Sequence, residues 1–180
     1  MKPILALLLA FCAWHGLSFA AAPTGTASES SVKAAFLHRI AGLVEWPAGS
    51  FQDADDPLVI GVAGNDAVAT DLEQLSEGRR VNGRAIVVRR WRDGDSPAGL
   101  HALLIGAGRE ARVQDLASIA GPLLVVTEQE EGHRLGGVIN FVVVDGRVRF
   151  TASLPLADAR GLRLSARLLA VAHSVEGRGR

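Results

Sequence analysis

Cysteine is almost absent from this chain of 180 residues, since the single one, Cys12, lies within the first twenty positions. Beyond it the chain can form no disulfide, thiol nucleophile or thiolate metal ligand, so its stability must come from its apolar core. Tyrosine is missing, and the 19 basic side chains equal the 19 acidic ones. A neutral total disfavours nucleic acid as a partner.

Residues 1–20 are predicted to be a cleavable signal peptide. Lys2 supplies the positive charge, residues 4–14 form the apolar region, and Ser18-Phe19-Ala20 is a small-x-small cleavage site. The bulky Phe11 before Cys12 argues against lipid attachment. Because no later run of about 18 apolar residues follows, direct membrane insertion is not expected.

Short apolar runs alternate with helical patterns along the rest of the chain. Strands are expected at 58–63, 85–88, 102–105 and 123–127, with a helix after the first and after the third of them and an arginine-rich loop after the second. Further helices are expected from Val32 to Trp46-Pro47 and over 162–175. This alternation predicts a three-layer α/β domain, with a mainly parallel sheet flanked by helices, over 31–176. A flexible tail at 21–30 precedes the domain, and a disordered tail at 177–180 follows it.

The stretch GGVINFVVVDGRVRFT, residues 136–151, predicts an antiparallel hairpin toward one edge of the sheet. Residues 138–144 are apolar on both faces, and Asp145-Gly146 suits a two-residue type I′ turn. Residues 147–152 alternate apolar and polar, as in a strand with one buried face. The pair Gly136-Gly137 permits a tight turn or a close backbone approach.

One motif favours an enzyme at first sight. Gly106 to Ala111 fits G-x-G-x-x-A after a strand, and Glu128 lies 22 residues beyond Gly106, as in a dinucleotide-binding fingerprint. However, two strands precede the motif, any tight strand-to-helix turn favours these glycines, and an exported protein meets little free NAD. We therefore expect no cofactor.

Other catalytic patterns are missing from the sequence. The string GDSPAG breaks the G-x-S-x-G pattern, and His38, His101, His133 and His173 have no metal-ligand spacing. We therefore expect no metal site and no enzyme activity. An enzyme would gain support only if His101, Glu128 and an arginine converged in one pocket.

Arginines crowd one region around Trp91, namely Arg79, Arg80, Arg84, Arg89, Arg90 and Arg92. Arginine and tryptophan are enriched at interface hot spots, but a solvated strand end would look the same. Both interpretations stay open.

Several strings of this chain match one family in order. They are VKAAFLHRIAGLVEWP (32–47), PLVIGVAGND (57–66), VNGRAIVVRR (81–90), HALLIG (101–106), LLVVTE (123–128), GGVINFVVVDGRVRFTASL (136–154) and GLRLSARLLAVA (161–172). Together they cover nearly the whole chain after the leader and resemble the YfiR family of bacterial periplasmic proteins.

The resemblance implies a periplasmic regulator that acts by protein–protein binding. Proteins of this family hold an inner-membrane diguanylate cyclase inactive, can be released by an outer-membrane lipoprotein, and form homodimers. Repression lowers cyclic di-GMP and disfavours biofilm. Some members carry disulfides, which this chain cannot form, so redox control is not expected here. A small-ligand-binding or sensory domain, with a crevice at the carboxyl ends of the strands, is the alternative.

Two groups of residues are candidates for partner binding. Gly136, Gly137, Asn140, Arg147 and Arg149 flank the hairpin, and Arg39, Glu45 and Trp46 mark the expected end of the first helix. Turn glycines, solvated arginines and a core tryptophan are the alternative interpretations. Replacing Gly137 by valine should damage folding if its φ is positive.

Overall fold

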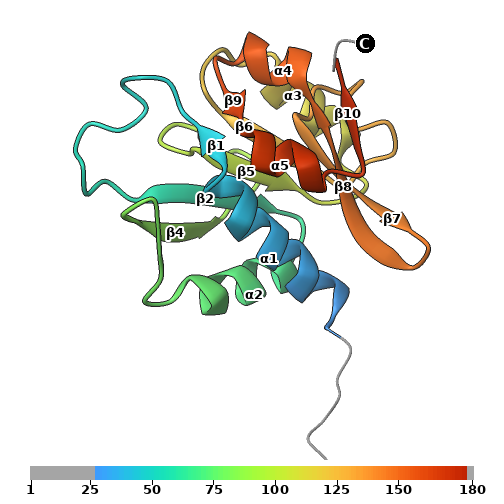
Figure 1. Cartoon of the computed structure of the whole chain (residues 1–180), viewed down its shortest axis with the longest axis horizontal. Helices are drawn as coiled ribbons and strands as arrows, with labels where there is room; N and C mark the ends of the chain where they lie inside the picture. Colours follow the sequence, from blue (N-terminus) through green and yellow to red (C-terminus); the bar gives the residue numbers. More distant parts are fainter. Residues whose placement is uncertain (1–26, 178–180) are drawn as a thin grey trace, which may run out of the picture.

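An eight-stranded sheet organises residues 27–177, the part of the chain that the computed structural model describes (Figure 1). Its strand order is β10-β8-β7-β6-β5-β2-β4-β3, and β1 and β9 form a separate two-stranded pair. The strands are β1 (Val44–Glu45), β2 (Leu58–Ala63), β3 (Arg80–Val81), β4 (Arg84–Arg90), β5 (Ala102–Ile105), β6 (Leu124–Thr127), β7 (Ile139–Val144), β8 (Arg147–Ser153), β9 (Arg163–Leu164) and β10 (Ser174–Glu176). The predicted signal peptide lies outside the described residues.

Strands β4, β2, β5, β6 and β7 are mutually parallel, and β7 and β8 form the antiparallel hairpin toward one edge. The helices are α1 (Glu29–Ala41), α2 (Asp66–Ser76), α3 (Glu110–Ala117), α4 (Leu154–Ala159) and α5 (Ala166–Val171). This arrangement confirms the predicted α/β sheet flanked by helices. No helix within residues 27–177 has the length and hydropathy needed to cross a bilayer.

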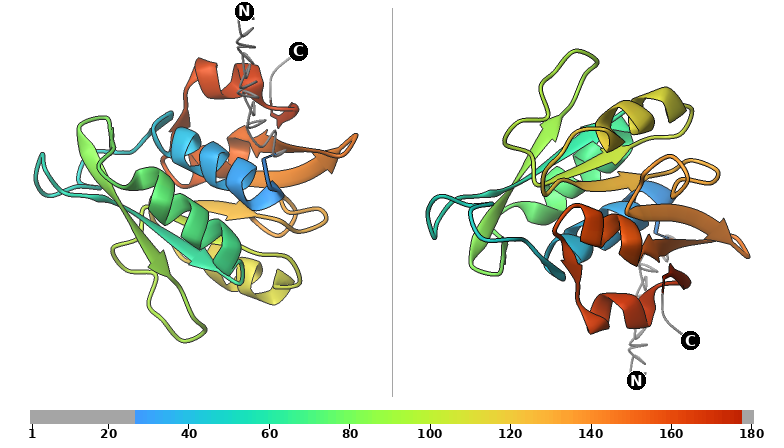
Figure 2. Two further views of the ribbon diagram at one scale, coloured as in Figure 1. Left: turned by 90° about the horizontal axis from the view of Figure 1, so that it is seen from below. Right: turned by 90° about the horizontal axis from the view of Figure 1, so that it is seen from above.

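Helices cover both faces of the sheet and give the molecule three layers. Helices α1 and α2 lie side by side on one face, and α3 lies on the other (Figure 2). Alternation along β2 divides its side chains between the two cores: Leu58, Ile60 and Val62 face α1 and α2, whereas Val59 and Ala63 face α3. The near-continuous apolar runs of the central strands follow from this double coverage.

The hairpin turn is as predicted, but its tip is not covered. Asp145 (φ 50°) and Gly146 (φ 69°) have the positive φ values of a type I′ turn, and Val143 pairs with Val148. The expectation that residues 138–144 are covered on both faces is wrong at the tip, where Val143 is 60% exposed. The hairpin projects past the helices there (Figure 1).

Helix α1 is shorter than predicted, and its buried face differs from the one that the larger apolar residues indicate. It starts after the N-cap Ser28 and stops at Ala41, because the chain turns at Gly42 and continues into β1. Its buried face carries Lys33, Ala34, Leu37, Ile40 and Ala41, whereas the expected Val32 and Phe36 are only half-buried. The small alanines at 34 and 41 permit close packing against the sheet and α2, and sequence periodicity did not register them.

The single helix predicted for residues 162–175 is wrong. Strand β9 pairs with β1, α5 follows with Ser165 as its N-cap, and β10 pairs in parallel with the outer edge of β8. The Ser165 side chain accepts a hydrogen bond from the amide of Leu168 at 3.3 Å, which fixes the start of α5. Pairing of β9 with β1 and of β10 with β8 satisfies backbone hydrogen-bonding groups of the short strands β1, β9 and β10. The apolar periodicity of residues 162–175 cannot reveal these distant partners.

Candidate functional site

The hairpin group of candidate residues divides into exposed and internal members. Arg147 and Arg149 are exposed on β8. Gly136 has a φ of 102°, whereas Gly137 does not lie in the positive-φ region. A Cβ added at Gly137 would instead lie 2.3 Å from Thr127 Cγ2, so the close approach of two backbone segments, rather than φ, requires glycine there.

Asn140 is 5% exposed and makes its contacts inside the protein. Its Oδ1 accepts a hydrogen bond from Thr127 Oγ1 at 2.7 Å, and its Nδ2 donates to the Gln129 carbonyl at 3.0 Å. Nearby, His133 donates from Nδ1 to the Gly137 carbonyl at 2.7 Å. These contacts hold the loop between β6 and β7 against the sheet.

The second candidate group lies at the other end of the parallel strands. Arg39 is exposed in the last turn of α1, and Glu45, on β1, is also exposed. Glu45 Oε2 lies 3.7 Å from Arg163 Nε, across the β1–β9 pair. Trp46 is half-buried near His101, which immediately precedes β5. The structure therefore separates this group from the hairpin tip, which follows the carboxyl end of β7.

Trp46 belongs to an aromatic cluster around His101. The Phe51 ring stacks on the His101 ring at 4.3 Å, and the Arg84 guanidinium lies 3.8 Å from the Phe51 ring centroid. His101 Nδ1 accepts from the Val59 amide at 3.1 Å, and Nε2 donates to the Ser50 carbonyl at 3.0 Å. The contact with the Val59 amide requires the neutral imidazole, because a protonated Nδ1 cannot accept a hydrogen bond.

This geometry predicts that the protein loses stability at mildly acid pH. Burial, joined by the Arg84 charge, lowers the pKa of His101 from 6.5, although the Ser50 carbonyl and Asp56 oppose the shift. Burial and Arg79 lower the pKa of His38 as well. Below the unfolded-state pKa the unfolded chain takes up protons that the folded chain refuses, so the free energy of unfolding falls as pH drops.

Urea unfolding at about pH 7.5 and about pH 5.5 checks this expectation. The wild type should be less stable at the lower pH, and His101→Gln should reduce the pH dependence even if it lowers stability throughout. An unchanged or rising stability toward pH 5.5 would contradict it.

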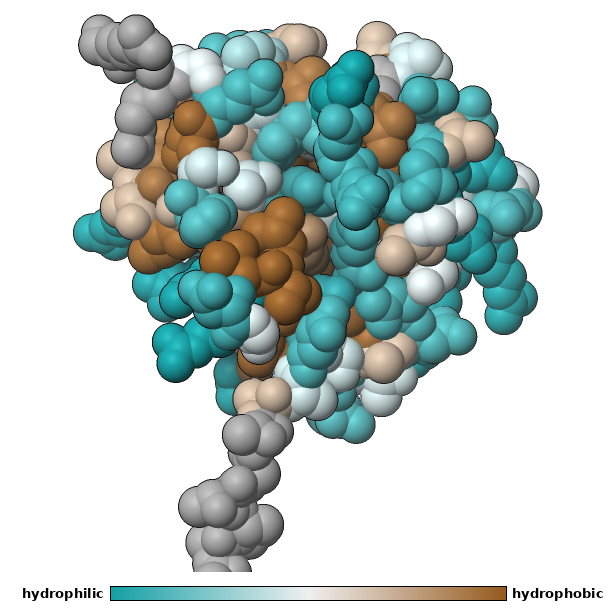
Figure 3. Space-filling model, turned by 90° about the vertical axis from the view of Figure 1, so that its right-hand side faces the viewer, coloured by the Kyte–Doolittle hydropathy of each residue, from teal (hydrophilic) through white to brown (hydrophobic). Residues whose placement is uncertain are grey.

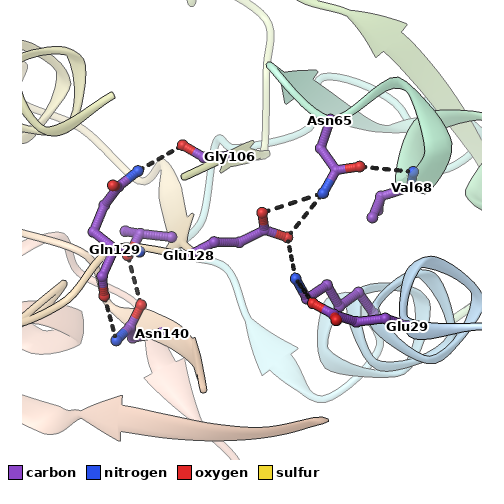
Figure 4. A network of polar contacts seen from close by, with 9 residues as sticks. Glu29, Asn65, Val68, Gly106, Glu128, Gln129 and Asn140 are labelled. Carbon is purple, nitrogen blue, oxygen red and sulfur yellow. Dashed lines mark hydrogen bonds and ion pairs between the residues drawn. The ribbon is translucent and has the colours of Figure 1, made fainter. Parts of the chain in front are cut away.

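A polar network joins α1, α2 and the end of β6 at the carboxyl ends of the strands (Figure 4). Glu128, 7% exposed at its side chain, lies 3.1 Å from the ammonium of Lys33. The Asn65 amide donates to both Glu128 carboxylate oxygens at 3.1 Å, and its Oδ1 caps α2 by accepting from the Val68 amide at 3.1 Å. Lys33 also pairs with Glu29 at 2.5 Å. The network thus ties two helix starts to one carboxylate.

The ammonium of Lys33 is held in its charged form. Burial by itself lowers the pKa of Lys33, but hydrogen bonds and charge attraction from Glu29 and Glu128 outweigh it, and the pKa is raised above 10.5. A group with a raised folded-state pKa contributes stability at lower pH and loses it as pH rises through that value. The Lys33 ammonium is therefore fully charged at neutral pH.

The loop after β5 is closed to a dinucleotide. Gln129 Oε1 accepts from the Gly108 amide at 3.1 Å, and its Nε2 donates to the Gly106 carbonyl at 2.6 Å. The Arg109 side chain covers Gly64, where an added Cβ would lie 2.3 Å from its Nε. A pyrophosphate needs free amides at this turn, and Glu128, the expected ribose ligand, is engaged by Lys33. The residues at the crevice between β2 and β5 do not fit the cofactor.

The residues that would have supported an enzyme do not converge. His101 precedes β5 and Glu128 follows β6, so they lie at opposite ends of two parallel strands. Within residues 27–177, no group of three histidine or acidic side chains could hold a metal ion.

Val143, at the hairpin tip, is 60% exposed, more than any other large apolar side chain within residues 27–177. We define the hairpin surface as Val32 and Phe36 of α1 together with Val143, Arg147, Val148 and Arg149. These residues line one hollow of ≈ 440 Å³. Figure 3 views this side of the molecule and shows an apolar patch ringed by hydrophilic side chains.

Cross-strand register explains how the hairpin surface forms. Val143 and Val148 are directly opposed, so their side chains share the face on which Phe36 contacts Phe150 at a ring distance of 5.5 Å. Arg147 and Arg149 form no ion pair within the described part of the chain. The surface therefore offers an apolar centre beside Arg147 and Arg149, with the acidic Glu29 lining the same hollow.

Sequence reasoning did not find three of the residues described above. Lys33 and Gln129 are polar residues that only the tertiary structure buries, and Val143 was expected to be covered. The signal for Lys33 was its spacing of four residues from the buried Leu37 and from the acidic Glu29. Gln129 carries no comparable signal in the sequence.

Comparison with known proteins gives one family and no individual relative. No curated protein matches the chain. A family model described as YfiR/HmsC-like matches residues 30–173, which contain every helix and strand of the structure except α1's first residue and β10. The match covers most of the chain and agrees with the resemblance carried by its sequence strings. The chain belongs to the YfiR/HmsC-like family.

Proposed function

We propose that this protein is a periplasmic regulator that represses an inner-membrane signalling protein of the diguanylate cyclase type, and so lowers cyclic di-GMP, by docking its hairpin surface on that protein. Family membership supports a regulatory role in cyclic di-GMP signalling. The small-ligand alternative is disfavoured at the turns after β2 and β5, because the Arg109 side chain covers Gly64 and Gln129 engages the Gly108 amide.

The observation that carries this proposal is the exposure of Val143, which is 60% accessible at the tip of a rigid hairpin. Interfaces bury an apolar centre within a polar rim, and arginine is enriched among their strongest contacts. Val143 and Val148 supply that centre, and Arg147 and Arg149 supply the rim. The matching partner surface would be apolar with carboxylates at its border.

Complementation of a deletion strain tests the proposal. Deleting the gene should raise cyclic di-GMP, and the wild-type gene should restore the low level. Val143→Glu should fail to restore it, because a charge at the apolar centre should weaken binding by about 10-fold or more. Cyclic di-GMP is measured in cell extracts, and the amount of each variant in the envelope fraction is measured by immunoblot.

Ile119→Glu is the matched control. Ile119 lies beyond the end of α3 and is 42% exposed, away from the hairpin surface. This variant should repress like the wild type. Unchanged cyclic di-GMP in the deletion strain under every growth condition, or full repression by Val143→Glu, would contradict the proposal.

A further inference from the structure

Strand β4 has an outer edge that is mostly unpaired. Its inner edge pairs with β2 from Ile86 to Arg90, but its outer edge pairs with β3 only at Arg84 and Ala85. The turn at Asn82 and Gly83 joins the two strands, and because β3 begins only at Arg80, the outer edge beyond Ala85 has no strand partner within residues 27–177. An edge of this kind is a template for another extended chain.

Backbone alternation shows which groups of β4 point outward. The Trp91 amide donates to the Val62 carbonyl at 2.9 Å, so Trp91 and the alternate residues Val87 and Arg89 direct their backbone groups toward β2. Ile86, Val88 and Arg90 therefore direct their N–H and C=O groups toward the open edge.

A groove of ≈ 600 Å³ runs beside this edge, between β4 and the end of α2. Ile86 and Val88 line it from β4, and Ser76 lines it from α2. Ser76 is only 6% exposed, and its hydroxyl has no hydrogen-bond partner within the described part of the chain.

Arg79 and Arg80 line the groove, whereas Arg89 and Arg92 lie outside it, on β4 and just beyond the end of β4. Arg79, Arg80, Arg89 and Arg92 are exposed, and none of them forms an ion pair within residues 27–177. Arg90 is different, since it lies 3.2 Å from Asp66 and 2.9 Å from Glu73. Glu77 is the groove's other acidic residue, so the two arginines that line the groove, Arg79 and Arg80, outnumber it.

We propose that the outer edge of β4 binds an extended acidic segment of a partner protein as an added strand. Backbone bonds to Ile86, Val88 and Arg90 would hold the segment, and its carboxylates would face the four arginines. A second copy of this chain is disfavoured, because it would bring its own arginines against the same edge. The site lies at the opposite edge of the sheet from the hairpin surface (Figure 1) and does not depend on the proposed function.

Amide hydrogen exchange, read residue by residue by NMR, tests the proposal. The probe is a peptide of about seven alternating valine and glutamate residues with blocked ends, long enough to span the edge. It should slow exchange at Ile86, Val88 and Arg90 by about 10-fold or more, while Val87 and Arg89, already paired with β2, should change little. A matched peptide of valine and lysine should have no effect.

Charge reversal supplies the matched variants. A variant that combines four substitutions should reverse the peptide preference and bind the lysine peptide instead of the glutamate peptide. The substitutions are Arg79→Glu, Arg80→Glu, Arg89→Glu and Arg92→Glu. Arg147→Glu with Arg149→Glu places similar changes on the far edge and should leave glutamate-peptide binding intact. Equal effects of both peptides on the wild type, protection elsewhere in the chain, or no protection at all would overturn the proposal; the last result would mean that the arginines only guard the edge.

Discussion

Gly132→Ala is expected to destabilise the fold by about 3 kcal/mol or more, because the new methyl group would break a buried polar contact. The added Cβ would lie 2.3 Å from Thr127 Oγ1 and 2.6 Å from Asn140 Oδ1. Thr127 Oγ1 donates a hydrogen bond of 2.7 Å to Asn140 Oδ1. Asn140 is only 5% exposed, so this bond is buried. Either the loop carrying Gly132 moves away, or the bond breaks and leaves buried polar atoms without partners. Urea unfolding measures the loss.

Gly146→Ala serves as the control for that variant. Gly146 has a φ of 69° in the hairpin turn, and an added Cβ would meet no atom within 4 Å. Its cost should be limited to backbone strain of about 1 kcal/mol. Gly132 has no positive φ, so equal losses in the two variants would show that the Thr127–Asn140 contact adds nothing to the cost of the Gly132 substitution.

Lys33→Met should lower the free energy of unfolding by about 3 kcal/mol. Methionine preserves the apolar stem of the side chain but removes the charge that lies 3.1 Å from Glu128. The Glu128 carboxylate, 7% exposed, would keep only the Asn65 amide as a charge-stabilising contact. Breaking a buried pair from one side leaves an uncompensated charge, which is the main origin of the loss.

The double variant Lys33→Met with Glu128→Met should recover most of that loss. Two apolar side chains at these positions leave no buried charge, and such replacements are often neutral or stabilising. Chemical unfolding of the wild type, both single variants and the double variant gives the coupling energy. Additive losses in the double variant would rule out a strong interaction between Lys33 and Glu128.

The sequence predicted the fold well where local patterns decide it. Apolar runs such as 58–63 and 102–105 became buried parallel strands, and Asp145-Gly146 formed the turn of the hairpin. It failed where distant partners decide. Residues 162–175 have a helical apolar period, but β1 and the edge of β8 draw parts of this segment into strands β9 and β10.

The candidate site was predicted only in part for a related reason. Arg147 and Arg149 could be placed on the hairpin from alternation alone. The exposure of Val143 depends on how far α1 reaches along the hairpin, which no local pattern encodes. Likewise, burial of Lys33 and Gln129 depends on contacts with Glu128 and the Gly106 carbonyl, each from another element.

The pairing of β1 with β9 joins Val44 to Leu164, and β10 pairs with β8 only afterwards in chain order. During synthesis from the amino end, β1 cannot pair until β9 has been made. The long loop between these two strands must close before their pairing can contribute any stability. Up to that moment the segment after α1 has no strand to bind. The β1–β9 pair is therefore expected to form late in folding, after the central strands of the sheet.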